Sequence, residues 1–157
     1  MTDNVRRVVT GHDKNGKAIV TIDEIITDIS RPRPGQSGAL VFMTDTFPID
    51  NNDAPADGAA TAATVKGRTT FRITTFDPGV ASRTHRTQSS EYGVVLSGEI
   101  KMVVDDTSVI MKAGDCFVQR GTIHDWLNEG QVPCVVAMIS MAALPVKIGD
   151  QILAPQG

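Results

Sequence analysis

The chain has 157 residues, of which 41% are hydrophobic and 21% charged, and its formal net charge is −3. This length corresponds to one domain and is sufficient to bury a core. No basic block exceeds the Arg6-Arg7 pair, which argues against nucleic-acid or membrane partners. The opening stretch MTDNVRRVVTGHD lacks the apolar region of a secretory signal, so the expected location is the cytoplasm.

The first third of the chain is expected to be β-structure followed by a long loop. Residues 5–29 read as two strands around the turn HDKNGKA, which predicts a hairpin. The prolines and glycines of 31–38 are expected to interrupt regular structure, and 39–47 reads as a short strand. Residues 48–67 are small and polar, which predicts a loop that is either a surface excursion or a substrate lid.

Beyond Gly67 the sequence reads as a succession of short strands. TTFRITTF alternates with the period of a strand, and three further strand-rich stretches follow, EYGVVLSGEIKMVVDD, SVIMKAGDCFVQRGTIHDWLNEG and VPCVVAMISM. Turn residues recur about every 8–12 positions, and no amphipathic helix is evident. These features predict an all-β sandwich or barrel. Both cysteines, Cys116 and Cys134, lie in apolar runs and are expected to be buried, reduced thiols.

Two stretches in this half resemble the two sequence motifs of the cupin superfamily. GVASRTHRTQSSEYGVVLSG matches the first motif through Gly79, His85, Glu91 and Gly98. GDCFVQRGTIHDWLN matches the second motif through Gly114, Gly121, His124 and Asn128. The resemblance covers 68–143, and VRRVVTGHDKNGKAIV is similar to the N-terminal arm of small single-domain cupins that carry a QRGT stretch.

The resemblance implies an all-β fold, a cupin jelly-roll β-barrel with an N-terminal β arm. Residues 1–67 would form the arm and long loop, packing on or swapping with the barrel, and residues 68–157 would form the barrel. Open sheet edges in such a barrel can be covered by a second chain, and cupins often pair in this way. We therefore expect a homodimer. The other expected binding partner is a small-molecule substrate.

The resemblance also implies a site at the barrel mouth, where His85, Glu91 and His124 would converge. Two imidazoles and one carboxylate are chemically sufficient to bind Fe, Mn or Zn. However, Thr87 stands where the first motif normally has a second histidine, and Gln119 stands where the second motif normally has a proline. The cofactor is therefore either one of these divalent metals or none.

Without a metal, the same residues would act as acids and bases. His124 can take and give a proton near neutral pH, with Glu91 as its partner and His85 beside it. Arg83 would be a catalytic residue that stabilises a carboxylate, enolate or phenolate. The expected substrate-binding residues are Thr87, Trp126, Arg72, Gln119 and Met102.

Three functional hypotheses follow. The favoured one is an acid–base lyase or isomerase that dehydrates, decarboxylates or isomerises an oxygenated, aromatic or polyketide-like substrate. The second is an Fe(II)-dependent dioxygenase with a 2-His-1-carboxylate site. The third is a non-catalytic small-molecule binding protein. Because cupins host many chemistries, the resemblance fixes the fold more firmly than the reaction.

Overall fold

The computed structural model describes residues 4–51 and 68–157, which fold into β-strands without an α-helix. The strands are β1 Arg6–His12, β2 Ala18–Ile25, β3 Ile29–Arg33, β4 Gln36–Thr44, β5 Thr69–Phe76, β6 Ser89–Ser97, β7 Glu99–Val104, β8 Thr107–Lys112, β9 Cys116–Arg120, β10 Asp125–Leu127, β11 Cys134–Ala142, β12 Val146–Ile148 and β13 Gln151–Leu153. None of the described residues forms a helix long and apolar enough to span a bilayer.

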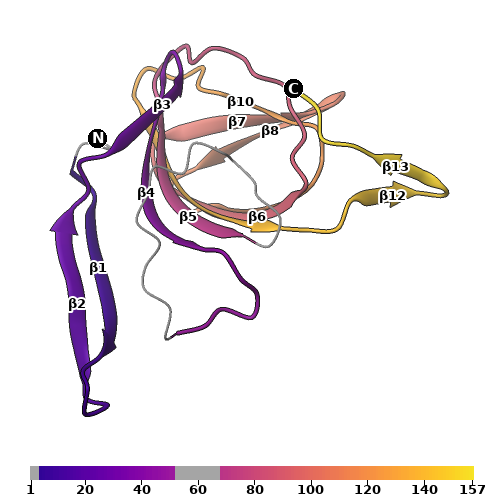
Figure 1. Ribbon diagram of the computed structural model, residues 1–157. Helices are drawn as coiled ribbons and strands as arrows, with labels where there is room; N and C mark the ends of the chain where they lie inside the picture. The colour runs from indigo at the N-terminus through magenta and orange to yellow at the C-terminus, as the bar shows by residue number, and fades with distance from the viewer. Residues whose placement is uncertain (1–3, 52–67) are drawn as a thin grey trace.

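Two antiparallel sheets form the barrel (Figure 1). One has six strands in the order β3-β4-β5-β11-β6-β9, and the other has three in the order β10-β7-β8. The non-consecutive order β5-β11-β6-β9 means that long connections cross between neighbouring strands, as in a jelly roll. The predicted all-β jelly-roll fold is confirmed.

The core lies between the two sheets. It is built mainly from side chains that the strands direct inward. Its buried members are Phe76, Val80, Val95, Ile100, Met111, Phe117, Trp126, Cys134 and Val136. Strand alternation explains one wrong expectation, because Phe117 points inward and the preceding Cys116 therefore points to solvent. Both thiols are free, as expected, but only Cys134 is buried.

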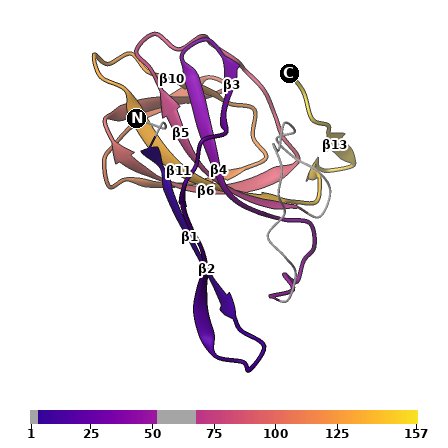
Figure 2. The ribbon, with the colours of Figure 1, turned by 60° about the vertical axis from the view of Figure 1, so that its left-hand side comes forward.

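The N-terminal hairpin of β1 and β2 forms its own two-stranded sheet and extends away from the barrel (Figures 1 and 2). Its register shifts between Val9 and Thr10. The prediction of a hairpin over 5–29 is confirmed. Of the predicted loop 48–67, residues 52–67 lie outside the described residues, so its role as a lid stays a prediction.

The expectation that residues 31–38 interrupt regular structure was wrong. Arg33 and Gln36 pair across a turn at Pro34-Gly35, where Gly35 has a φ of 76°, so this segment joins β3 to β4. Proline before a glycine with positive φ favours such a turn. Pro32 is tolerated because β3 is an edge strand whose register is irregular between Ser30 and Arg33. Both strands extend the six-stranded sheet.

Two glycines allow close packing in the barrel. Gly98 joins β6 to β7 with a φ of 74°, and a Cβ there would lie 2.7 Å from Pro133 O. Gly93, on β6, lies beneath the Phe117 ring, because a Cβ at this position would approach the ring carbon Cζ to 2.3 Å. A larger residue at Gly93 would displace the aromatic core below the site.

Candidate functional site

His85 and His124 lie directly opposite each other on adjoining segments. The backbone N–H of each donates to the carbonyl of the other, with both N···O distances 2.9 Å, and forms an isolated antiparallel bridge. Opposed residues in an antiparallel pair project to the same face, so their side chains meet. The two imidazole centroids are 4.4 Å apart. The structure therefore brings together two of the three residues expected to form the site.

The His85 ring is oriented by its own loop. Its Nδ1 lies 2.9 Å from the carbonyl oxygen of Arg83, which can only accept, so Nδ1 carries the proton. In the neutral ring Nε2 then holds the lone pair. Burial lowers the pKa of His85 below its ordinary value, and the charges of His124 and Arg83 add to this shift. The hydrogen bond to the Arg83 carbonyl and the charge of Glu91 oppose it only in part. His85 is therefore a neutral base at neutral pH.

His124 is fully buried, with 1% of its surface exposed, and is held through Nδ1. This atom lies 3.0 Å from Thr122 O and 3.1 Å from the Gln119 amide nitrogen. The same amide donates to Thr122 O at 2.9 Å, and contact of Gln119 with a substrate stays a prediction. Gln119, in place of the usual proline, thus fixes the turn before His124 and the plane of its ring.

Glu91 lies within a group of hydroxyls, and its charge also acts on His85. Its Oε1 accepts from Ser89 Oγ at 3.1 Å, Ser140 Oγ at 3.2 Å and Thr87 Oγ1 at 3.5 Å. Ser140 is its cross-strand partner on β11, which explains the contact. Arg72, on β5, has its pKa lowered by burial and partly restored by the charge of Glu91. The two therefore interact electrostatically inside the barrel.

The expected three-ligand metal set is only partly assembled. In the described ranges, 4–51 and 68–157, no three histidine, cysteine or acidic side chains are grouped to hold a metal ion. The two imidazoles meet, whereas the Glu91 oxygen is engaged by hydroxyls. The residues as arranged do not fit a metal held by all three, and we derive no catalytic step through one.

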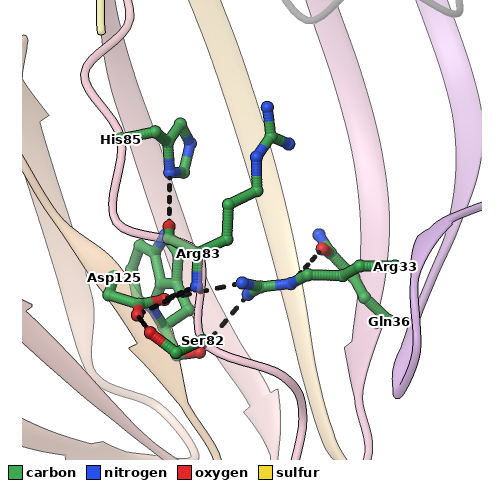
Figure 3. A network of polar contacts seen from close by, with 7 residues as sticks. Arg33, Gln36, Ser82, Arg83, His85 and Asp125 are labelled. Carbon is green, nitrogen blue, oxygen red and sulfur yellow. Dashed lines mark hydrogen bonds and ion pairs between the residues drawn. The ribbon is translucent and has the colours of Figure 1, made fainter. Parts of the chain in front are cut away.

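Asp125 anchors the loop that carries His85 and lies below that histidine in the view of Figure 3. Its carboxylate accepts from Arg83 N at 2.9 and 3.0 Å, from Trp126 N at 2.7 Å and from the Ser82 hydroxyl. Arg33 Nη1 lies 3.5 Å from Asp125 Oδ1, and the two side chains are only 9% and 6% exposed. This buried ion pair ties the β3–β4 turn to the second cupin motif.

The electrostatics of this pair follow from its surroundings. Burial alone would raise the pKa of Asp125, but hydrogen bonds from Ser82, Arg83 and Trp126, together with Arg33, outweigh burial and lower it. Burial lowers the pKa of Arg33, and Asp125 opposes that shift. The aspartate is therefore held ionised as a structural anchor.

Arg83 uses its backbone and its side chain differently. Its N–H donates to Asp125 and its carbonyl accepts a hydrogen bond from His85 Nδ1, whereas its guanidinium extends away from Asp125 beside the His85 ring (Figure 3). Arg83 is exposed, so its charge is directed to solvent and to the space around His85.

The remaining predicted binding residues lie deeper. Trp126 is 4% exposed and packs against Phe117 with centroids 5.0 Å apart, its ring 6.0 Å from that of His124. Met102, its partner across β7 and β10, packs against the core cluster. Trp126 thus packs next to His124, and Met102 packs against the core. Contact of either residue with a substrate stays a prediction.

A cavity of about 570 Å³ opens beside His85. It is formed by residues 83 and 85–88, by 142–143 at the end of β11, and by 155–157. The last segment is held by Arg86, whose backbone N–H donates to Gln156 O at 2.8 Å and whose carbonyl accepts from Gln156 N at 3.0 Å. Thr87 and Arg83 both line this cavity, and their contact with a substrate stays a prediction.

Sequence reasoning missed several residues of this site. Arg33 lies in the proline-rich stretch expected to lack structure, and no local pattern connects it with Asp125. Ser89 and Ser140 gave no signal beyond strand positions. Asp125 did have a sequence signal, because it lies between His124 and Trp126 in the second motif.

Comparison with known proteins establishes the family. A cupin domain model matches residues 72–140. Phomopsin biosynthesis cluster protein C' of Diaporthe leptostromiformis is 33% identical over 94% of this chain and 83% of its own length. The cupin-domain-containing oxidoreductase virC of Hypocrea virens is 31% identical, covering 92% and 79%. The chain belongs to the cupin family.

Solved structures agree on the fold. The cupin domain of Schizosaccharomyces pombe Cnp3 superposes with a TM-score of 0.54 at 12% identity, covering 87% of each chain. At this identity the likeness concerns the barrel architecture alone.

Proposed function

We propose that this cupin is a small-molecule enzyme that performs acid–base chemistry: dehydration, decarboxylation or isomerisation of an oxygenated, aromatic or polyketide-like substrate. The observation that carries the proposal is the His85–His124 pair, whose rings lie 4.4 Å apart beside a cavity of about 570 Å³. Relatives named for biosynthesis clusters support chemistry on small molecules.

In this proposal His85 is the base. Its Nδ1 proton is bound to Arg83 O, so the lone pair of Nε2 is left to accept a proton from the substrate. His124, whose Nδ1 is engaged by Thr122 and Gln119, exchanges the proton within the pair. Glu91 balances the charge from its hydroxyl-lined position, and Arg83 stabilises negative charge that develops on the substrate.

The test is a search for turnover with matched histidine variants. Purified protein is incubated with small-molecule extracts of Diaporthe leptostromiformis or Aspergillus ruber, the organisms of two relatives, and products are followed by mass spectrometry. We expect His85→Ala and His124→Ala to abolish turnover. The control, His12→Ala, removes an exposed histidine on β1 and should retain full turnover. Full activity in His124→Ala would rule out the proposal.

A second candidate, an Fe(II)-dependent dioxygenase, is favoured by the names of two relatives, virC and the cupin-domain-containing oxidoreductase fogC of Aspergillus ruber. Iron bound near stoichiometrically, lost in His85→Ala and accompanied by oxygen consumption, would support it. Tight ligand retention without turnover would instead support a binding protein.

The expected homodimer stays a prediction. The β1–β2 hairpin extends from the barrel and leaves Val8, Val20 and Ile25 about half exposed, with 51%, 56% and 47% of their surfaces accessible. A second copy that covers these side chains would bury apolar surface. Size-exclusion chromatography with light scattering should give twice the chain mass of 16.8 kDa, and a single-chain mass would contradict the prediction.

A further inference from the structure

We propose that the cavity beside His85 receives the substrate as an organic anion, with a carboxylate or enolate bound between Arg83 and Arg86. This inference rests on the proposed function, because it names the substrate class for the same site. It is carried by the charges of the cavity wall, by the partners of the two arginines and by the size of the cavity.

The cavity wall carries two cationic side chains. Arg83 and Arg86 are among its ten lining residues, beside the neutral His85. None of the ten is an aspartate or glutamate, and the negative group among them is the terminal carboxylate of Gly157. Within the described part of the chain, neither arginine forms an ion pair with a carboxylate. Guanidinium groups offer paired N–H donors whose spacing matches a carboxylate, so two of them on one wall favour an anionic ligand.

The nearest buried carboxylate is already neutralised by a different arginine. Asp125 pairs with Arg33 and takes only the backbone N–H of Arg83. The guanidinium of Arg83 is left pointing away from Asp125, at the level of the His85 ring (Figure 3). The network therefore fixes the position of the Arg83 backbone while its side-chain charge remains available to the cavity.

Arg86 has one N–H donor that no hydrogen-bond acceptor among the described residues satisfies. Its backbone N–H and carbonyl pair with Gln156, and its Nη1 donates weakly to Ala154 O at 3.5 Å. Its Nε is buried without a hydrogen-bond partner among the described residues. A buried donor of this kind is usually satisfied by a partner, and an anionic oxygen in the cavity would supply one.

The other lining residues and the cavity volume limit the size of the ligand. Ala142 and Ala143 are small and apolar, and Thr87 adds one hydroxyl. Small-molecule pockets commonly measure about 300–1,000 Å³, so 570 Å³ is enough for a carboxylate on a ring or short chain. With its anion between the arginines, the ligand would present neighbouring carbon to His85.

The test uses benzoate as the probe and benzamide as its neutral analogue. Each is titrated into isotopically labelled full-length protein, and backbone amide shifts are followed by NMR. We expect saturable shifts at residues 83–88 and 142–143 with benzoate, which weaken as sodium chloride is raised, and none with benzamide. Arg83→Gln and Arg86→Gln should each weaken the affinity for benzoate by about ten-fold. This is the effect expected when a charge-assisted hydrogen-bonding partner is lost.

Lys112→Gln is the matched control, since it removes the same charge from the exposed end of β8. It should bind benzoate as wild type does. Arg83 is exposed, so its variant should fold even if Arg86→Gln loosens the segment around Gln156. Absence of saturable shifts with benzoate would overturn the inference, as would equal binding of benzamide or unchanged affinity in Arg83→Gln. Benzoate binding without turnover on any extract would instead contradict the proposed function.

Discussion

Asp125 directly follows His124 in the second motif, Glu91 belongs to the first motif, and the surroundings of these two carboxylates differ in kind. Asp125 is held by two backbone N–H groups, a hydroxyl and the guanidinium of Arg33. Glu91 accepts from three hydroxyls, those of Thr87, Ser89 and Ser140. Backbone donors and a buried cation hold Asp125 ionised, whereas the hydroxyls around Glu91 can rotate. The first arrangement stabilises the fold, and the second suits the charge-balancing role proposed for Glu91.

The largest expected effect comes from breaking the Asp125 anchor. Asp125→Asn leaves Arg33 buried without its counter-charge and should lower the free energy of unfolding by about 3 kcal/mol. Urea unfolding followed by circular dichroism measures this loss. Asp106→Asn, in the exposed turn after β7, is the control and should change stability by less than about 0.5 kcal/mol. Equal effects of the two changes would show that the anchor is not structural.

Replacing Glu91 should have the opposite signature. Glu91→Gln keeps an oxygen for the surrounding hydroxyls but removes the negative charge that balances the protonated histidine pair, so turnover should fall by about 100-fold. The free energy of unfolding should change by less than about 1 kcal/mol. Steady-state rates on the substrate found in the extracts, measured beside urea unfolding, separate the two effects. Lost stability with retained turnover would reverse the roles assigned to Glu91 and Asp125.

Removing one of the hydroxyls that bind Glu91 should reduce turnover less than replacing Glu91 itself. Ser140→Ala deletes the cross-strand donor at 3.2 Å and should cost about 1 kcal/mol of stability. Turnover should fall by less than in Glu91→Gln, because Ser89 and Thr87 still bind the carboxyl. An effect on turnover as large as that of Glu91→Gln would mean that Ser140 itself contacts the substrate.

The pH dependence of stability distinguishes Asp125 from His85. The folded pKa of Asp125 is lowered, so its stabilising contribution is present above the unfolded value of 3.8 and is lost as pH falls through the folded pKa. The folded pKa of His85 is lowered as well. The unfolded chain therefore binds the extra proton as pH falls below 6.5, and stability decreases there.

Unfolding measured from pH 8 to pH 3 checks both windows. The gap between wild type and Asp125→Asn should close below about pH 4. His85→Asn should reduce the loss of stability between about pH 6.5 and pH 5. A stability difference for Asp125→Asn that persists unchanged at pH 3 would contradict the ionised anchor.

Strand alternation and turn residues are local signals, and they were sufficient to predict an all-β sandwich or barrel. The resemblance to the two cupin motifs supplied the jelly roll and located His85 and His124, although their pairing depends on a bridge between distant segments. Arg33 could not be found in this way, because Pro32 and Pro34 suggested a break in regular structure. Only the edge position of β3 allows a strand there, and that position is a property of the assembled sheet.

The placement of Glu91 was also beyond the sequence. Its spacing from His85 suggested a shared metal site, yet its cross-strand neighbour Ser140 and its strand neighbour Ser89 engage the carboxylate. Residues on paired strands become neighbours only when the register is known. Serines carry no motif, so the hydroxyl surroundings had no local signature.

The central claim is that the histidine pair moves protons rather than electrons, and the mass balance of the product tests it most directly. Wild-type protein and His124→Ala are incubated with the reactive extract fraction in air and under argon, and substrate and product masses are compared. We predict a product that has lost water or carbon dioxide, or has unchanged mass, formed equally well under argon and absent with His124→Ala. A product that has gained oxygen atoms, and forms only in air, would contradict the account.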